Sequence, residues 1–346
     1  MRHYFMVAGL TLVLSFSAVW VWVAAMPLAF LDPEYPSWLA KQTLLRRCDL
    51  GEVLVLGDSR AAVGIIPALL PVKTTNLAVG GGEAIEAHAA LSRALRCPVP
   101  PRLVVLSFDA AHFMQPELFW ERTMRFGFLD RTELAALRET SRRLGDFSVY
   151  EERHTDGIPS WIRDHLYTLR FPPYYFSSLV KGGAFLRWNR NNHALKEGIA
   201  ARGQYYFGTA QGSSAVAAEG RLGTFRPLPV LDDYFSRVLA LLEDRGIPAV
   251  FVSMPLNDTT ARTMHPVLRD GFAAWLAGYE IRYPGFRVAW PATLAWPDRW
   301  FGDGFSHLNP AGAERFSGML SRCLAGDSKP CDVRWPAVPR IMARGD

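Results

Sequence analysis

A chain of 346 residues with 49% apolar and 21% charged residues is long enough to bury a sizeable core, and this composition excludes a disordered polymer. The net charge is +5, with 38 basic and 33 acidic residues spread along the sequence. The sequence therefore has no basic stripe of the kind that binds nucleic acid, and we expect no nucleic-acid partner.

The sequence begins with an apolar run over residues 4–30, which ends shortly before Asp32. The run exceeds the roughly 20 residues that cross a bilayer, and it is longer than the core of an ordinary signal peptide. We therefore predict one N-terminal transmembrane helix as a membrane anchor over 1–31. A linker over 32–50 follows, with a short amphipathic helix at 37–47.

Two features of this N-terminal region leave alternatives open. The small residues at 23–25 resemble a cleavage site, so a cleaved signal segment is the alternative to an anchor. Basic residues on both sides of the run also compete in setting its orientation. They are Arg2 before the run, and Lys41, Arg46 and Arg47 after it. We place the body outside the cytoplasm on the cysteines and on the resemblance described below.

The four cysteines show no metal-ligand spacing. Cys48 lies five residues before a predicted strand that begins at Val53, and Cys97 lies five residues before another predicted strand. If those strands are parallel neighbours, the two thiols lie side by side. We predict the disulfides Cys48–Cys97 and Cys323–Cys331, which suit an oxidising compartment. Four unrelated buried thiols are the alternative.

Apolar runs and helical patterns alternate after the linker, which predicts one α/β domain over 51–325 with a parallel sheet. The runs lack clean polar alternation, as is typical of strands buried on both faces. Strands are predicted at 53–56, 73–79, 102–108, 249–254 and 286–290. Helices are predicted at 83–96, at 232–245 with an acidic N-cap and a glycine after its end, and from Asn309-Pro310 onward.

An insertion over about 110–230 separates the third and fourth predicted strands and is rich in aromatic residues and arginine. A helical pattern covers 131–145. A segment of this length is typical of a lid or a partner-docking surface, with plain core packing as the alternative for its aromatic part. The C-terminal tail over 326–346 is expected to be extended.

Ser59 stands in Gly57-Asp58-Ser59-Arg60, directly after the first predicted strand. Open parallel sheets bind ligands at the carboxyl ends of their strands, so Ser59 is a candidate nucleophile. The tripeptide Gly-Asp-Ser is also common in ordinary turns, because all three residue types favour turn conformations. Ser59 alone therefore does not decide between a nucleophile and a turn.

A serine nucleophile needs a base and donors for the oxyanion. His307 lies in the loop before the last helix, at the same sheet edge, and Asp303 four residues earlier is placed to orient its imidazole. Three glycines at 80–82 follow the second predicted strand and present backbone N–H groups at this edge. A surface histidine and a tight turn are the alternative interpretations.

These segments together resemble the SGNH (GDSL-like) hydrolase superfamily. Residues 57–60 match its first block, which implies Ser59 as nucleophile and backbone donor. Asn76 to Gly82 match the second block, which implies Gly81 as an oxyanion donor. Residues 303–307 match the last block. The resemblance implies a flavodoxin-like three-layer α/β/α sandwich with strand order near 2-1-3-4-5.

Two departures from the family pattern affect the site. The last pair of the family is Asp-x-x-His, whereas one more residue separates Asp303 from His307, so Asp298 is an alternative acid. The third block, Gly-x-Asn-Asp in the family, is replaced by residues 107–113, so Asp109 or His112 is expected to line the site instead. The predicted triad is Ser59, Asp303 and His307. The residues predicted to bind the oxyanion or substrate are Gly81, Asn76, Asp58, Arg60, Asp109 and Asn257.

The anchor, the altered third block and the insertion resemble the envelope acyl-transfer branch of the superfamily, which includes the alginate O-acetylation proteins and the D-alanine-transfer protein DltD. This resemblance implies a single-pass protein of the cytoplasmic membrane with its body in the periplasm. It implies a membrane-bound O-acyltransferase (MBOAT) partner and acyl transfer through Ser59 to a polysaccharide or glycolipid. A periplasmic esterase and a non-catalytic scaffold are the alternatives. No metal or other cofactor is expected.

Overall fold

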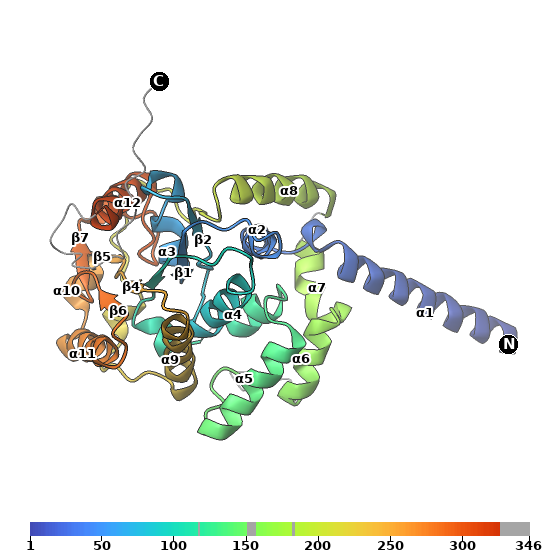
Figure 1. Cartoon of the computed structure of the whole chain (residues 1–346). Helices are drawn as coiled ribbons and strands as arrows, with labels where there is room; N and C mark the ends of the chain where they lie inside the picture. Colours follow the sequence, from blue (N-terminus) through green and yellow to red (C-terminus); the bar gives the residue numbers. More distant parts are fainter. Residues whose placement is uncertain (117, 151–156, 182–183, 326–346) are drawn as a thin grey trace.

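The computed structural model describes residues 1–116, 118–150, 157–181 and 184–325, and shows a mixed α/β body preceded by one long helix (Figure 1). Five parallel strands form the main sheet in the order β2-β1-β3-β4-β6. When the five strands of this sheet are numbered 1 to 5 in chain order, their order is 2-1-3-4-5, as predicted. Their bounds are β1 (Val53–Gly57), β2 (Thr74–Asn76), β3 (Leu103–Ser107), β4 (Ala249–Phe251) and β6 (Phe286–Val288). A second, two-stranded sheet, which the sequence did not predict, pairs β5 (Pro255–Asn257) with β7 (Leu294–Trp296).

Helices cover both faces of the main sheet because successive strand residues point to opposite sides. In β1, Leu54 and Leu56 belong to one apolar cluster, whereas Val53 and Val55 belong to the other. The first cluster is completed by α4 (Ala84–Ala94), α9 (Pro229–Asp244) and α11 (Pro266–Arg282), and the second by α3 (Ser59–Gly64) and α12 (Pro310–Leu324). The domain therefore has three layers.

Helix ends follow the capping residues, with one correction. The Asn309 side chain accepts from the Gly312 N–H at 3.0 Å and caps α12, as predicted. The left-handed Gly246 follows α9, also as predicted. The prediction that α9 starts at Asp232 was wrong, because the helix begins at Pro229 and Asp232 lies in its first turn.

The insertion is largely helical in its described part and packs around the N-terminal segment. Helix α2 (Tyr35–Arg46) lies against α8 (Ala184–Ala200). The other helices of the insertion are α5 (Arg131–Leu144), α6 (Ser160–Thr168) and α7 (Pro172–Lys181). It also contains the short 3₁₀ helices η3 (Ala111–Phe113) and η5 (Ala218–Arg221) and the π-helix η4 (Phe119–Met124). Outside the insertion lie α10 (Asp258–Thr263) and the turns η1 (Pro27–Ala29), η2 (Pro67–Leu69) and η6 (Asp298–Trp300).

Helix α1 (Arg2–Ala25) is, within the described residues, the one helix long and apolar enough to cross a membrane. It projects away from the body in Figure 1, and residues 1–19 are exposed. The apolar run continues beyond the helix, but Pro27 stands where α1 has ended, and residues 28–31 are buried in the domain.

The disulfide Cys48–Cys97 is present, with 5.5 Å between the two Cα atoms. It joins the segments that precede β1 and β3, which are paired in parallel register from Val53 opposite Leu103. The parallel pairing therefore explains why the two cysteines meet. The second predicted disulfide includes Cys331, which lies outside the described residues, as does the tail over 326–346.

Candidate active site

The residues around Ser59 form a sharp turn from β1 into α3. The Asp58 side chain caps α3 by accepting from the N–H groups of Arg60 at 2.9 Å and Ala61 at 3.3 Å. A Cβ at Gly57 would lie 1.9 Å from the Ser107 carbonyl oxygen, so only glycine fits this close approach to β3. Ser59 is thereby held at the first position of α3, at the carboxyl edge of the sheet.

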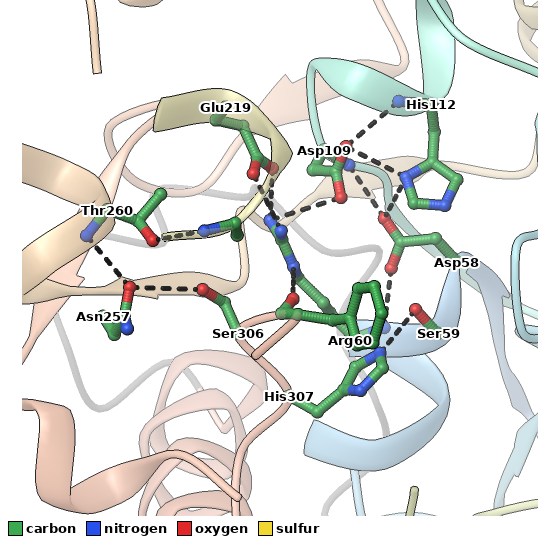
Figure 2. A network of polar contacts seen from close by, with 12 residues as sticks. Asp58, Ser59, Arg60, Asp109, His112, Glu219, Asn257, Thr260, Ser306 and His307 are labelled. Atoms are coloured by element: carbon green, nitrogen blue, oxygen red, sulfur yellow. Dashed lines mark hydrogen bonds and ion pairs between the residues drawn. The ribbon is translucent and has the colours of Figure 1, made fainter. Parts of the chain in front are cut away.

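Figure 2 shows the Ser59 hydroxyl directed at His307, with 2.7 Å between Oγ and Nε2. The other ring nitrogen, Nδ1, lies 2.5 Å from Oδ2 of Asp303. A proton on Nδ1 satisfies the carboxylate and leaves Nε2 free to accept from Ser59, which is the arrangement of a general base. Three residues from two distant segments therefore form one hydrogen-bonded chain.

The loop between Asp303 and His307 accommodates its additional residue by a local backbone change. Ser306 adopts a left-handed conformation with φ of 60°. The Oδ1 of Asp303 accepts from the N–H groups of Phe305 at 2.9 Å and His307 at 3.3 Å. Burial would raise the pKa of Asp303, but the hydrogen bond and charge of His307 outweigh burial and lower it, so the carboxylate form is favoured.

Asp298, the alternative acid, is engaged elsewhere. Its carboxylate accepts from the Thr259 hydroxyl at 2.9 Å and from the Thr259 N–H at 3.3 Å. Asp298 is also not among the residues that line the cavity at Ser59. The geometry therefore places Asp303, and not Asp298, beside the imidazole.

Backbone donors lie at the same cavity as Ser59. The Ser59 N–H belongs to the first turn of α3, where backbone donors have no partner within the helix. Gly81 lines the cavity with a left-handed φ of +67°, and a Cβ there would lie 2.6 Å from Leu118. These two N–H groups suit an oxyanion.

A buried ion network connects Ser59's helix to the insertion. Arg60 donates to both carboxylate oxygens of Glu219, at 2.5 and 2.9 Å, and its Nη1 lies 3.2 Å from Asp109. Its Nε donates to the Phe305 carbonyl at 3.1 Å, in the loop that carries His307. Arg60 thus holds α3 and the histidine loop together, as Figure 2 shows. The two carboxylates raise the pKa of Arg60 against the effect of burial, so the guanidinium remains charged.

His112, which follows β3 in the chain, lines the cavity. Its Nδ1 lies 2.9 Å from Asp109 and 3.5 Å from Asp58. Burial would lower the pKa of His112, but these two carboxylates outweigh it and raise the pKa to about 9. Against the effect of burial, Arg60 and His112 hold the pKa of Asp109 well below its ordinary value. At neutral pH the cavity therefore presents an imidazolium.

Three predicted site residues have other structural roles, and the first of them, Asp58, caps α3. The Asn76 amide donates to the carbonyls of Ala61 and Ile65, both at 2.9 Å, so it fixes the end of α3. The Asn257 amide donates to the carbonyls of residues 213 and 215, and its Oδ1 caps α10. None of these three residues lines the cavity.

The cavity has a volume of about 510 Å³ and is partly open to solvent. Phe207 of the insertion stacks on the His307 ring, with 4.9 Å between centroids. Glu34, which follows α1 in the chain, also lines the cavity, and Arg122 lies 2.7 Å from its carboxylate. Sequence reasoning did not single out Phe207, Glu219 or Glu34, because none belongs to a motif or a periodic pattern.

Asp58, Asp109 and His112 are also the one group found in the described residues with potential metal-ligand atoms all within 4.8 Å. Protein groups already engage these atoms, since Asp58 Oδ2 accepts from the Asp109 N–H at 2.8 Å and His112 Nδ1 lies 2.9 Å from Asp109 as an ion pair. Coordination would require His112 to lose the proton that its neighbours favour. We therefore describe the group as an ion network.

Comparison with known proteins found no matching family model, no matching curated protein and no matching solved structure. The fold and the site by themselves define the class of protein: a layered α/β protein with a Ser-His-Asp arrangement at the carboxyl edge of a parallel sheet.

Proposed function

We propose that the protein is a membrane-anchored serine acyltransferase of the SGNH type, which moves an acyl group to an envelope polysaccharide or glycolipid through an acyl-Ser59 intermediate. The observation that carries this proposal is the chain of hydrogen bonds from Ser59 Oγ through His307 to Asp303, at 2.7 and 2.5 Å. The sheet order and the position of Gly81 agree with such a protein.

In the first step, Ser59 Oγ bonds to the acyl carbon of the donor while its proton passes to Nε2 of His307. The carbonyl electron pair moves onto oxygen, which the N–H groups of Ser59 and Gly81 stabilise. When this intermediate collapses, the donor's leaving group departs with the proton from Nε2. Asp303 stabilises the imidazolium in the interval.

In the second step, a hydroxyl of the acceptor attacks the acyl-serine and gives its proton to His307. The tetrahedral intermediate then releases the acylated acceptor, and the proton returns to Ser59 Oγ. The third block of the SGNH pattern supplies an asparagine donor to the oxyanion, and residues 107–113 have no asparagine there. His112, which belongs to this segment, lines the cavity and supplies a positive charge instead. Its imidazolium would favour the oxyanion over the neutral carbonyl.

The proposed location is the periplasmic side of the cytoplasmic membrane, with an MBOAT protein as partner. Helix α1 supports a membrane location by its length and composition. The Cys48–Cys97 disulfide supports an oxidising compartment. The sequence resemblance described above is the argument for the partner and for the acceptor.

Labelling of the full-length protein with a serine-directed fluorophosphonate tests the nucleophile. We expect the wild type to be labelled and Ser59→Ala to be silent. Ser214→Ala, an exposed serine of the insertion, is the matched control and should be labelled like the wild type. Equal labelling of the wild type and Ser59→Ala would reject Ser59 as the nucleophile.

Mass spectrometry of envelope polysaccharides and glycolipids from wild-type and Ser59→Ala strains tests the direction of the reaction. A transferase predicts lower acyl content in the variant strain, whereas an esterase predicts higher acyl content. Unchanged acyl content would contradict both enzymes and leave the scaffold hypothesis.

A further inference from the structure

The two helices of the insertion nearest to α1 expose a group of large apolar side chains. Trp161 on α6 and Leu169 at its C-terminal end are eight residues apart, and Phe176 and Val180 on α7 are four residues apart. Each pair therefore lies on one side of its helix. The exposed fractions are 57% for Trp161, 47% for Leu169, 67% for Phe176 and 68% for Val180. We refer to these four residues as the α6–α7 surface.

The turn between α6 and α7 is bonded to the C-terminal half of α1. The Trp20 indole donates to the Leu169 carbonyl at 2.8 Å. The Phe171 ring packs edge-on against Trp20 and Phe16, with centroid distances of 5.4 and 6.0 Å. In Figure 1, α1 leaves the body beside α7 and runs at a steep angle to it. These contacts fix the depth of the turn relative to the apolar helix.

That depth can be worked out from helix geometry. A hydrocarbon layer of about 30 Å takes up about 20 helical residues at 1.5 Å each, which leaves about two residues of α1 outside it at each end. Trp20 then lies about 5 Å inside the layer and Phe16 about 10 Å inside. Because Phe171 contacts both rings, the α6–α7 turn lies at about the same depth, which is that of interfacial amphipathic helices.

We infer that the α6–α7 surface is inserted into the lipid leaflet around α1, so that the body rests on the membrane and is not suspended from a flexible tether. The inference rests on the assignment of α1 as a membrane span and not on the chemistry of Ser59. Lipid is the occupant because α7 and the α6–α7 turn contact α1, whose apolar side chains are exposed over residues 1–19. The Arg170 guanidinium donates to the Ala24 carbonyl at 3.2 Å. It thus provides a hydrogen-bond partner for a backbone carbonyl in the last turn of α1, at the polar boundary of the membrane.

Contacts from α7 also connect this surface to the cavity. Tyr175 of α7 is buried and donates to the Arg125 carbonyl at 3.3 Å, just after η4. Arg122 of η4 pairs with Glu34 in the cavity wall. Membrane insertion of α7 would thus hold the cavity at a set height above the bilayer, which suits an acyl donor presented at the membrane.

The inference is tested by measuring the depth of a fluorophore on the full-length protein. Phe176→Cys is labelled with a nitrobenzoxadiazole probe without reducing agent, so that the Cys48–Cys97 disulfide stays intact. The protein is reconstituted alone into vesicles of phosphatidylcholine and phosphatidylglycerol that contain doxyl-labelled phosphatidylcholine. We expect a blue-shifted emission and loss of most of it to the doxyl quencher. Val180→Cys is a second labelled variant with the same expectation.

Ile281→Cys is the matched control, because Ile281 is 87% exposed on α11. Its label should emit as in water and should not be quenched. Labels at Phe176 and Val180 that behave like the label at Ile281 would overturn lipid insertion and leave the surface for a protein partner. Fluorophosphonate labelling of the same vesicles reports on Ser59 separately, so failure of either proposal is recognised independently.

Discussion

The carboxylate of Asp303 lies 2.5 Å from Nδ1 of His307, although the turn between them is one residue longer than an Asp-x-x-His spacing. The left-handed Ser306 and the two backbone bonds to Asp303 absorb that residue. The pair is thus positioned by a particular loop conformation and not by spacing alone.

Asp303→Asn is expected to lower the rate of fluorophosphonate labelling and of acyl transfer by about 10³-fold to 10⁴-fold, because an amide favours the wrong tautomer of His307. Asp298→Asn is the matched control and should leave the rates unchanged, since the Asp298 carboxylate is bonded to Thr259 and does not reach His307. Loss of activity in Asp298→Asn with activity kept in Asp303→Asn would reverse the assignment.

The raised pKa of His112 predicts a pH-dependent contribution to stability. Its pKa is about 9 in the folded protein, against 6.5 for an ordinary histidine. The stabilisation is therefore complete below pH 6.5 and is lost as the pH rises through about 9, with a magnitude of about 3 kcal/mol. It is measured by denaturant unfolding of the detergent-solubilised full chain at several pH values. The contribution of His112 is the free energy of unfolding of the wild type minus that of His112→Gln.

The difference between the two proteins is needed because Lys41 acts in the opposite direction. Burial lowers the pKa of Lys41 to about 7 from 10.5, so its contribution makes the protein more stable as the pH rises through this range. His193→Gln, an exposed position on α8, should keep the wild-type slope. A slope in His112→Gln equal to that of the wild type would contradict the prediction.

Removal of Glu219 should destabilise the protein strongly, because Arg60 would remain charged and buried after losing two hydrogen bonds. We expect Glu219→Ala to lower the free energy of unfolding by about 3 kcal/mol, with Asp109 limiting the loss. Glu139→Ala breaks the exposed pair with Arg142 and should cost less than about 1 kcal/mol. Equal effects of the two substitutions, measured by denaturant unfolding, would refute a structural role for the buried pair.

The Cys48–Cys97 disulfide closes a loop that contains β1, α3, β2 and α4, and thus the turn at Ser59. For a sequence separation of 49 residues, chain entropy predicts a stabilisation of about 4 kcal/mol. The double variant Cys48→Ser/Cys97→Ser should therefore unfold at clearly lower denaturant concentration. The same midpoint for this variant and the oxidised wild type would rule out this role.

Much of the fold followed from local patterns. Buried runs of Val and Leu predicted the five strands of the main sheet, because strands covered on both faces need apolar residues at every position. The Cys48–Cys97 pairing followed from the parallel arrangement of two neighbouring strands, whereas the strand order was implied by the sequence resemblance and not by local patterns. The small β5–β7 sheet was not predicted, because three-residue strands carry too little pattern.

Site residues could be predicted only where they belong to a motif or follow directly after a predicted strand. Asn76 shows the limit, since its place in a motif suggested the site but its amide is used to fix α3. Phe207 and Glu219 come from irregular parts of the insertion. There, neither a periodic apolar pattern nor a motif spacing predicts where a side chain points.

By itself, the sequence determined the apolar N-terminal helix, the parallel α/β pattern, the position of Ser59 directly after a buried strand and that of His307 just before the last helix. Only the tertiary structure decided that Asp303 reaches the imidazole, that Arg60 binds Glu219, and that Phe207 covers His307. The reason is physical: periodicity and capping are set by neighbours within a few residues, whereas Arg60 meets Glu219 and Phe207 meets His307 only when the insertion packs against the sheet. Asp303 and His307 are four residues apart, but their contact depends on the left-handed Ser306 between them, which spacing does not predict.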